Sequence, residues 1–287
     1  MSVWHEIFSF EHYGELLSLV RNSLVAGAVL GLVGGLVGTF VLLRDVTFAV
    51  HGVSELSFAG AAAALLFGFD VVVGSLAGAL AAAALIGVLG AGARDRNSFI
   101  GVLMPTGLGL GVLFLALYKG RSVNKFGVLT GQIVAIDTPR LSWLVAISVL
   151  VVVCLAVMSR PLTFASVDPD VAAARGVPAG ALSLAFMLVL GLAVAASVQI
   201  VGALLVLALL CTPAAAALRV TASPVLAPVL SVVFATSAML GGILLALGAS
   251  IPISPYVTTL SFLIYVACRI VGAVRTRRGW TARRAPA

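Results

Sequence analysis

SLVAGAVLGLVGGLVGTFVLL, residues 23–43, is a run of apolar and small residues without a single charge. A helix of this length crosses a hydrocarbon core of about 30 Å. Comparable runs recur as far as Val271, 62% of the 287 residues are apolar, and the mean hydropathy is +1.22. Charged residues make up 9% of the chain, whereas a soluble domain carries about 25%. The solvent of this chain is therefore lipid, and we predict an all-α fold, a polytopic bundle of transmembrane helices.

The pattern of apolar runs predicts eight or nine spans in one domain, 23–273. Two neighbouring runs are separated only by Arg44 and Asp45, and two others run together through Gln199 and Gly202. A tilted, short or re-entrant segment at either place would reduce the count from nine to eight. The candidate spans are 23–43, 46–67, 71–92, 99–118, 141–158, 182–200, 201–218, 224–246 and 255–273.

Basic residues predict the orientation in the membrane. The tail 274–287 contains five arginines, and Lys and Arg are retained on the cytoplasmic side. Counting spans back from a cytoplasmic C-terminus also places Arg219 and the segments 94–96 and 159–181 inside, and the loop 119–140 outside. The N-terminal segment 1–22 lacks the features of a secretory signal and reads as an amphipathic segment at the membrane surface.

Small residues recur at four-residue spacing within the spans. Gly27 and Gly31 are one example, and the pairs 34–35 and 241–242 are others. Such residues let membrane helices approach closely, so they predict a compact bundle.

One ionisable pair remains inside a predicted span. The other nine acidic residues fall near the N-terminus, at span ends or in loops, but Glu55 lies within 46–67 with His51 four residues before it. A charge near the bilayer centre costs about 2.5–3.5 kcal/mol, so such residues are usually paired and functional. An imidazole and a carboxylate on one helix face suit Zn, Mn or Fe, with Ser54, a second subunit or water completing the coordination. The alternatives are a mutually satisfied polar contact and a proton relay.

A second polar feature is the segment 159–181. Asp168 can cap a short helix that has Pro169 in its first turn, and Gly176 followed by Pro178 would end it. We expect this helix on the cytoplasmic face, either as an ordinary connector or as a docking element.

Several motifs are missing from the sequence. There is no phosphate-binding loop, no H-E-x-x-H and no pair of carboxylates within the spans. The sequence thus predicts no catalytic residue and no enzyme, and any ATP must be hydrolysed by another chain. Nucleic-acid binding is a poor interpretation of the basic tail, because such a tail beside a final span more often fixes that end in the cytoplasm. The expected partner of the spans is membrane lipid, and no nucleic acid is expected.

Four stretches of the sequence carry a resemblance to a known family: Val41–Arg44 with Val50–Gly60, Phe126–Gly131, Asp168–Pro178 and Val201–Ala215. The last of them has the pattern V-G-x-x-L-V-x-A-L-L-x-T-P-A-A and is the most specific. In these stretches the sequence resembles the permease subunits of zinc/manganese/iron ABC importers, a family of the metal ABC-3 type.

The resemblance implies a type II-like importer in the bacterial inner (cell) membrane, with 23–273 as its permease domain. Such permeases pair with a second copy, receive a divalent metal ion from an extracytoplasmic binding protein and are driven by two cytoplasmic ATPase subunits that use the ATP. The metal is cargo, and no cofactor is bound permanently. Thr212 and Pro213 match a helix bend of the family. The segment that couples to the ATPase would include Asp168, Pro169, Asp170, Ala173, Arg175 and Gly176.

The second span departs from the family pattern. The family usually has G-D-A-x-S-H-A-x-L-P-G, in which Asp and His bind the metal, whereas here His51 stands at the Asp position and Glu55 at the His position. Ala59 replaces the family's proline. The ligand types are therefore retained in exchanged places, which leaves the identity of the metal open.

Two other functions remain as alternatives. An ATP-independent cation channel or secondary transporter could use the same His51 and Glu55. An ABC permease for a metal chelate would keep the architecture and change the cargo, although compact Gly/Ala-rich spans disfavour a larger substrate.

Overall fold

The computed structural model describes residues 20–89, 93–120, 136–167, 169–247 and 253–283. Most of the predicted amphipathic segment 1–22, the stretch Phe126–Gly131, Asp168 and the end of the basic tail lie outside these residues.

The described part of the chain is all-α, as predicted, and contains no strand. Eight of its helices are long and apolar enough to cross a membrane, and Leu205–Val220 forms a shorter apolar helix, so the predicted count of eight or nine is confirmed. The helices are α3 (Arg21–Leu43), α4 (Thr47–Phe67), α5 (Val71–Leu89), α6 (Ala93–Leu117), α8 (Thr138–Val167), α9 (Pro169–Ala174), α10 (Ala179–Val201), α11 (Ala203–Val220), α12 (Leu226–Ala246) and α13 (Ile253–Arg283).

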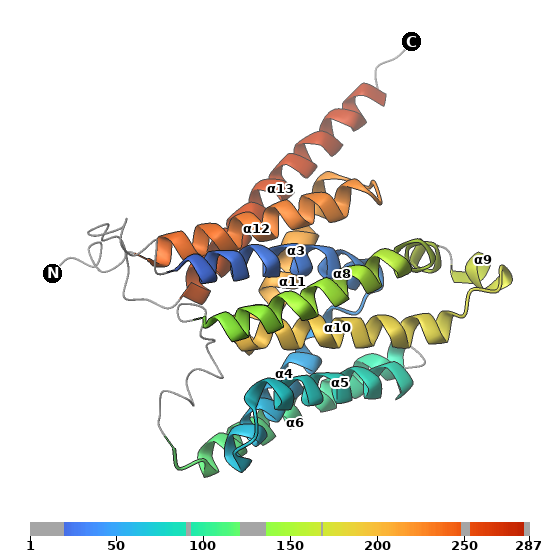
Figure 1. Ribbon diagram of the computed structural model, residues 1–287. Helices are drawn as coiled ribbons and strands as arrows, with labels where there is room; N and C mark the ends of the chain where they lie inside the picture. The colour runs from blue at the N-terminus through green and yellow to red at the C-terminus, as the bar shows by residue number, and fades with distance from the viewer. Residues whose placement is uncertain (1–19, 90–92, 121–135, 168, 248–252, 284–287) are drawn as a thin grey trace.

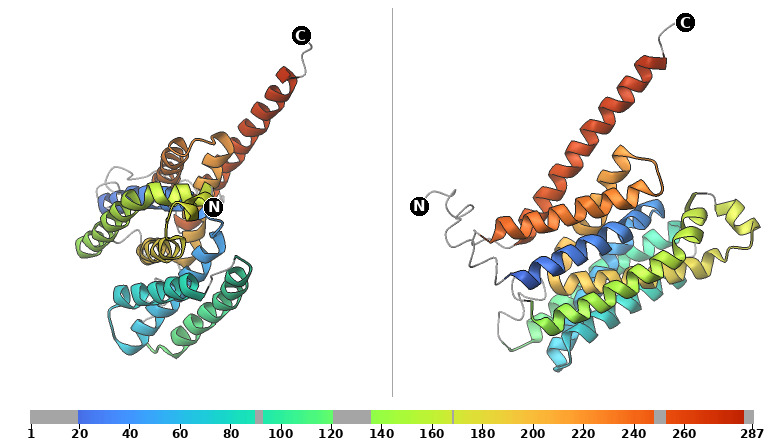
Figure 2. Two further views of the ribbon diagram at one scale, coloured as in Figure 1. Left: turned by 90° about the vertical axis from the view of Figure 1, so that its right-hand side faces the viewer. Right: turned by 45° about the horizontal axis from the view of Figure 1, so that its top comes forward.

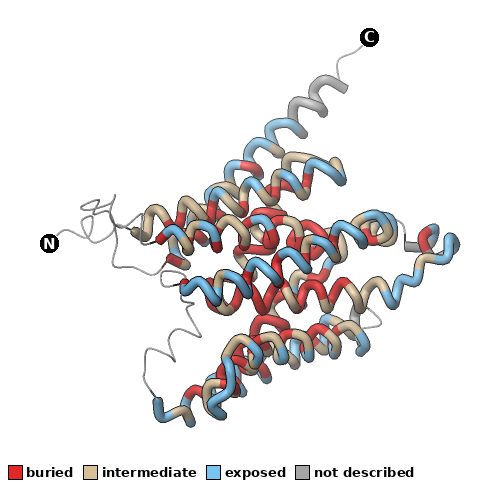
Figure 3. The backbone as a smooth tube through the Cα atoms, viewed as in Figure 1, coloured by how far each residue is buried: buried red, intermediate tan, exposed pale blue. Residues whose placement is uncertain are grey.

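The helices form two groups that meet at α10. In Figure 1, α4, α5 and α6 lie together at the bottom, and α3, α11, α12 and α13 form the upper part. Helix α10 packs against α5 on one side and against α8 and α11 on the other. Buried residues concentrate along α3, α10 and α11, whereas α6, α8 and α13 present exposed faces (Figure 3). The exposed faces are rich in Val, Leu and Phe, as expected of surfaces in contact with lipid.

The short helix α9 marks one end of the bundle. It lies beyond the ends of α8 and α10, at the right of Figure 1, and we call this side the α9 end. The link between α11 and α12 lies at the same end (Figure 1), where Arg275 of α13 donates to the carbonyl of Val220 at 3.2 Å. At the opposite end, Asn22 donates to the carbonyl of Ile136 at 3.2 Å, which joins the starts of α3 and α8.

Glycines on α3 allow two helices to pack closely against it. A Cβ atom on Gly31 would lie 2.6 Å from the Thr236 Cα of α12, and one on Gly35 would lie 2.5 Å from the Val232 Cα. On another face of α3, a Cβ on Gly38 would overlap the Leu210 carbonyl oxygen of α11. The close packing predicted from the glycine spacing is confirmed, and it makes α3 the central helix of the upper group.

The helix that carries His51 and Glu55 is held in the same way. Gly60 of α4 lies against Gly74 and Gly78 of α5, with no room for a Cβ between the two backbones. The hydroxyls of Ser57 and Ser75 join the same two helices through a 2.8 Å hydrogen bond. Helix α4 therefore has a fixed position against its neighbour.

Helix α8 is longer than the predicted span 141–158. It continues through Pro161 to Val167, so the first part of the predicted segment 159–181 is helix. The hydroxyl side chains there donate hydrogen bonds to backbone carbonyls of the same helix. Thr163 donates to the Ser159 carbonyl at 2.8 Å, and Ser166 donates to the Leu162 carbonyl at 2.6 Å. Polarity alone therefore did not mark the end of this helix.

The junction between α10 and α11 is a single residue. Gly202 has φ 79° and ψ 160°, a backbone conformation open essentially only to glycine. The two apolar runs that adjoin in the sequence are thus separate helices, broken at the glycine.

Candidate functional site

Glu55 lies inside the membrane-spanning part of α4. It is eight residues after Thr47, about 12 Å along the helix axis from its start at the α9 end. Its exposed fraction is 5%, and among the residues whose side chains the structure describes it is the one buried charged residue. Burial of a carboxylate is costly without a cation or hydrogen-bond donors, so its surroundings decide what it does.

His51 is the nearest ionisable neighbour of this carboxylate. The His51 Nε2 and Glu55 Oε1 atoms are 3.6 Å apart, beyond the 2.7–3.2 Å range of an N–H···O hydrogen bond. Two ligands bonded at about 2.0–2.2 Å to one tetrahedral ion lie about 3.3–3.6 Å apart. The observed separation is therefore closer to that of two ligands of one ion than to that of a hydrogen-bonded pair.

Both side chains also contain a buried atom without a partner. The second carboxylate oxygen of Glu55 and the Nδ1 atom of His51 are enclosed, and neither has a hydrogen bond in the described structure. A polar contact between the two side chains, one of the alternatives above, would leave these two atoms without partners. Unsatisfied buried polar atoms of this kind need an explanation, and an absent ligand is one.

Ser54, the suggested helper, is buried beside the pair. Its hydroxyl donates to the His51 carbonyl at 2.9 Å. Because the hydroxyl proton of Ser54 is donated to this carbonyl, the lone pairs of its oxygen stay available to a cation.

Helix α6 packs against α4 at the position of Glu55. A Cβ on Gly107 would lie 3.0 Å from the Glu55 carbonyl carbon and 3.1 Å from its Cβ. One turn away, Gly52 faces Ile100 and Met104 of the same helix. On this side of α4, α6 thus presents apolar side chains and a glycine backbone, which offer no counter-charge.

The ligand set within one chain is small. In the part of the chain that the structure describes, no three His, Cys, Asp or Glu residues converge on a common point. His51 and Glu55 supply two ligands, and the others must come from Ser54, water or another subunit.

The predicted short helix is present at the α9 end. Helix α9 covers Pro169–Ala174, so Pro169, Asp170 and Ala173 all have helical backbone. Gly176 ends the segment with φ 79°, and the Val177 amide donates back to the Ala172 carbonyl at 3.0 Å. Arg175 is exposed. The helix start at Pro169 and its stop at Gly176 are confirmed, whereas docking to an ATPase stays a prediction.

Thr212 and Pro213 lie within α11. Pro213 has no N–H, so the Leu209 carbonyl four residues earlier lacks its helical donor. Gly34 of α3 approaches this carbonyl, with a hypothetical Cβ 3.4 Å from the oxygen. The proline is accommodated against the central helix, and the bend itself stays a prediction.

A feature not singled out as a site is Arg44, in the link between α3 and α4. Its guanidinium lies 5.6 Å from the centre of the Phe186 ring, a cation–π distance. Burial, and secondarily the nearby positive charge of Arg96, lowers the pKa of Arg44 below its ordinary value. Arg96 in turn donates to the Asp45 carbonyl at 3.3 Å. In the sequence, the signal for this pair of arginines was the number of arginines near the ends of the predicted spans.

Comparisons with known proteins extend this description. A family model described as the ABC 3 transport family matches residues 17–272. The chain is 28% identical over 212 residues to a manganese transport system membrane protein, MntC, of Halalkalibacterium halodurans, covering 73% of each protein. It is 31% identical over 202 residues to the manganese import system permease protein ScaB of Streptococcus parasanguinis, covering 69% of this chain and 71% of the relative.

Among solved structures, the fold is similar to PsaBC from Streptococcus pneumoniae in complex with Fab. The TM-score is 0.80 at 24% identity, and the match covers 89% of this chain and 94% of the other. The arrangement of helices in Figure 1 is therefore a known one, and the match extends over nearly the whole chain.

Proposed function

The chain belongs to the ABC 3 transport family, and we propose that it is the membrane permease of an ATP-driven importer whose cargo is a divalent transition metal. Manganese is the first choice, because two relatives are named as manganese transport proteins. Carboxylate and imidazole ligands suit Mn, Fe and Zn, so the chemistry of the pair agrees with this cargo.

The observation that carries the proposal is the free carboxylate oxygen of Glu55. It is buried, it has no hydrogen-bond donor in the described structure, and the only ionisable partner at hand is an imidazole 3.6 Å away. A cation bound between His51 Nε2 and Glu55 Oε1 would also give the free Glu55 oxygen a partner, whereas His51 Nδ1, on the other side of the imidazole ring, would need a separate one. The negative charge of Glu55 would offset part of the ion's loss of hydration, and neutral His51 would add a directional ligand.

We propose that the remaining ligands are transient. Two fixed ligands hold an ion less tightly than four, which suits a site that must release its cargo. Ser54, water and a second copy of the permease are the candidates for the rest of the coordination sphere.

The α9 end would face the cytoplasm. Arg44, Arg96, Arg175 and Arg275 all belong to this end, and the positive-inside tendency supports that orientation. Helix α9 protrudes there with Arg175 exposed, in a position for two ATPase subunits of a dimeric transporter to reach it. An extracytoplasmic metal-binding protein would deliver the ion at the opposite end.

Uptake by proteoliposomes tests this function. The chain is purified together with a P-loop ATPase subunit as its partner, and radioactive manganese entry is measured with and without ATP and an extracytoplasmic metal-binding protein. We expect uptake only when the ATPase and ATP are both present. Uptake by the permease alone would instead favour the channel or secondary transporter, and uptake only of chelated metal would favour a chelate permease.

A further inference from the structure

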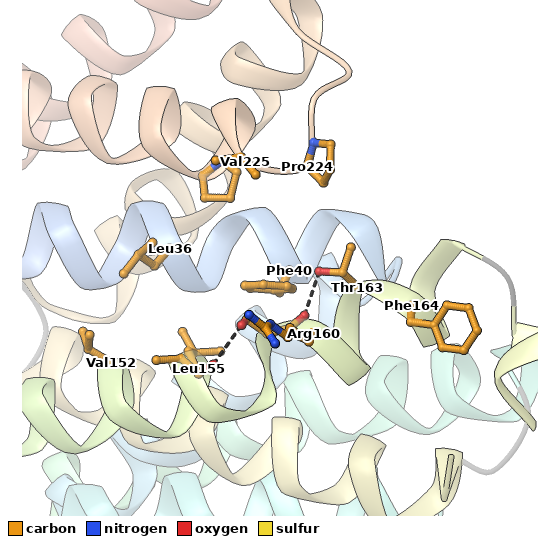
Figure 4. Close-up of a pocket in the computed structure, with 12 residues that line it drawn as sticks. Leu36, Phe40, Val152, Leu155, Arg160, Thr163, Phe164, Pro224 and Val225 are labelled. Carbon is orange, nitrogen blue, oxygen red and sulfur yellow. Dashed lines mark hydrogen bonds between the residues drawn. The ribbon is translucent and has the colours of Figure 1, made fainter. Parts of the chain in front are cut away.

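A groove opens on the face of the bundle formed by α3, α8 and the start of α12. Its volume is about 710 Å³, and most of its lining residues are apolar. Helices α8 and α12 both pack against α3, so α3 forms its floor. Figure 4 shows Leu36 and Phe40 of α3 directed toward Val152 and Leu155 of α8, with Val225 on the other side. None of the lining residues belongs to α4, the helix that carries His51 and Glu55.

The apolar part of the groove continues along α3. Val25 and Leu32 are exposed on this helix, and Val29 and Leu36, which alternate with them along it, are half-buried. The spacing of 25, 29, 32 and 36 places all four on one face of a helix. This stripe runs lengthwise through the membrane, which is the direction of an acyl chain.

One cation stands at the α9 end of the groove. Arg160 is exposed and directed toward Phe40 (Figure 4), and it has no hydrogen bond or ion pair to any described residue. The groove has no acidic lining residue. The hydroxyls of Ser159 and Thr163 beside it donate to carbonyls of their own helix at 2.8 Å each. The guanidinium is therefore the one lining group in this part of the groove with free donors.

The position of Arg160 along α8 matches the level of lipid headgroups. It lies nineteen residues after Leu141, or about 28 Å along a straight helix, close to the thickness of the hydrocarbon core. An unpaired guanidinium at this depth, with an apolar channel leading away from it, is complementary to a lipid phosphate with its acyl chain.

We propose that this groove binds an anionic phospholipid, with the phosphate on Arg160 and an acyl chain between α8 and α12 along α3. A zwitterionic lipid would bring an ammonium group as well as a phosphate, and the groove has no acid to receive it. Binding therefore favours headgroups of net negative charge, which are enriched where basic pockets between helices face the cytoplasm.

The test is native mass spectrometry of the full-length protein titrated with phosphatidylglycerol or phosphatidylcholine of identical acyl chains. Phosphatidylglycerol is expected to bind about fivefold more tightly than phosphatidylcholine, because one additional interfacial charge contributes about 1 kcal/mol. Arg160→Gln should remove this preference, and Arg160→Lys should keep most of it. Arg269→Gln, which removes another exposed arginine on α13, should change neither affinity by more than about twofold.

Two further variants test whether an acyl chain or a second copy of the permease occupies the groove. Ala156→Trp should weaken both lipids, because it fills the groove that the acyl chain occupies. Equal binding of the two lipids, or equal effects of Arg160→Gln and Arg269→Gln, would overturn the proposal. So would efficient disulfide formation between two copies carrying Val225→Cys, because Val225 would then be covered by a second permease.

Discussion

Gly107 of α6 and Glu55 of α4 are in backbone contact. A Cβ at position 107 would lie 3.1 Å from the Glu55 Cβ and 2.6 Å from Leu56 Cδ1. The backbone of α4 at the buried acid is thus packed closely against a neighbouring helix, where an added methyl group would have to displace Leu56 and press on Glu55.

Gly107→Ala should therefore disturb the site without changing any ligand. Overpacking of this kind typically costs about 1–3 kcal/mol, and we expect metal uptake to fall by about tenfold. Gly109→Ala on the same helix is the matched control, because a Cβ there meets nothing within 4 Å. If both variants transported metal at the same rate, the contact between α6 and α4 would have no role in shaping the site.

Exchanging the two ligands should preserve transport better than replacing either one. His51→Asp leaves two carboxylates and Glu55→His leaves two imidazoles, and each single variant should lose about tenfold or more of its uptake. The double variant His51→Asp/Glu55→His restores one ligand of each type at the same spacing and should recover a measurable part of it. A double variant no better than the worse single variant would argue that position, rather than ligand type, decides function.

The packing of α3 against α11 gives a prediction on stability. In Gly38→Ala the new methyl group would overlap the Leu210 carbonyl, which belongs to a backbone and cannot move aside alone. We expect the thermal midpoint in detergent to fall by about 5 °C. Gly180→Ala at the start of α10 meets no atom within 4 Å and should leave the midpoint nearly unchanged. An equal shift in both variants would contradict the close packing.

The segment at the α9 end can be tested through its backbone. Gly176 has φ 79° and no neighbour within 4 Å of a Cβ, so Gly176→Ala introduces strain of about 1 kcal/mol and no collision. We expect metal-stimulated ATP hydrolysis of the complex to fall severalfold. Gly176→Asn should retain most of it, because Asn tolerates the left-handed conformation. Equal loss of activity in both variants would indicate that any side chain added at position 176, rather than strain in the turn, is the cause.

Much of the fold could be predicted because lipid imposes simple rules. Runs of apolar residues located every span, and the spacing of Gly27, Gly31 and Gly35 indicated the close packing of α3. Helix ends were harder to predict. Helix α8 extends through Pro161 to Val167, with hydroxyl side chains that bond to carbonyls of the same helix, and α13 extends into the basic tail as far as Arg283. A change from apolar to polar residues marks where a span leaves the hydrocarbon core, and a helix need not end there.

The candidate site was predictable in its members but not in its geometry. The rarity of charge inside the spans singled out His51 and Glu55 from the sequence. The 3.6 Å separation follows from their i, i+4 positions on one helix, but the burial of their unpartnered atoms and the contact of α4 with Gly107 depend on how other helices pack around α4. The groove at Arg160 was not anticipated, because its walls come from three helices that are distant in the sequence. Contacts between distant segments leave little signal in a single sequence.

The measurement that tests the central claim most directly is ATP-driven manganese uptake by proteoliposomes containing Glu55→Gln. This variant keeps the size of the side chain and removes its charge, so the site loses the group that offsets the ion's dehydration. Asp45→Asn makes a similar acid-to-amide change at an exposed position in the α3–α4 link and serves as the control. We predict that Glu55→Gln reduces uptake at least about tenfold while Asp45→Asn stays within about twofold. Uptake by Glu55→Gln at the rate of the unaltered protein would contradict the assignment of His51 and Glu55 as the metal site.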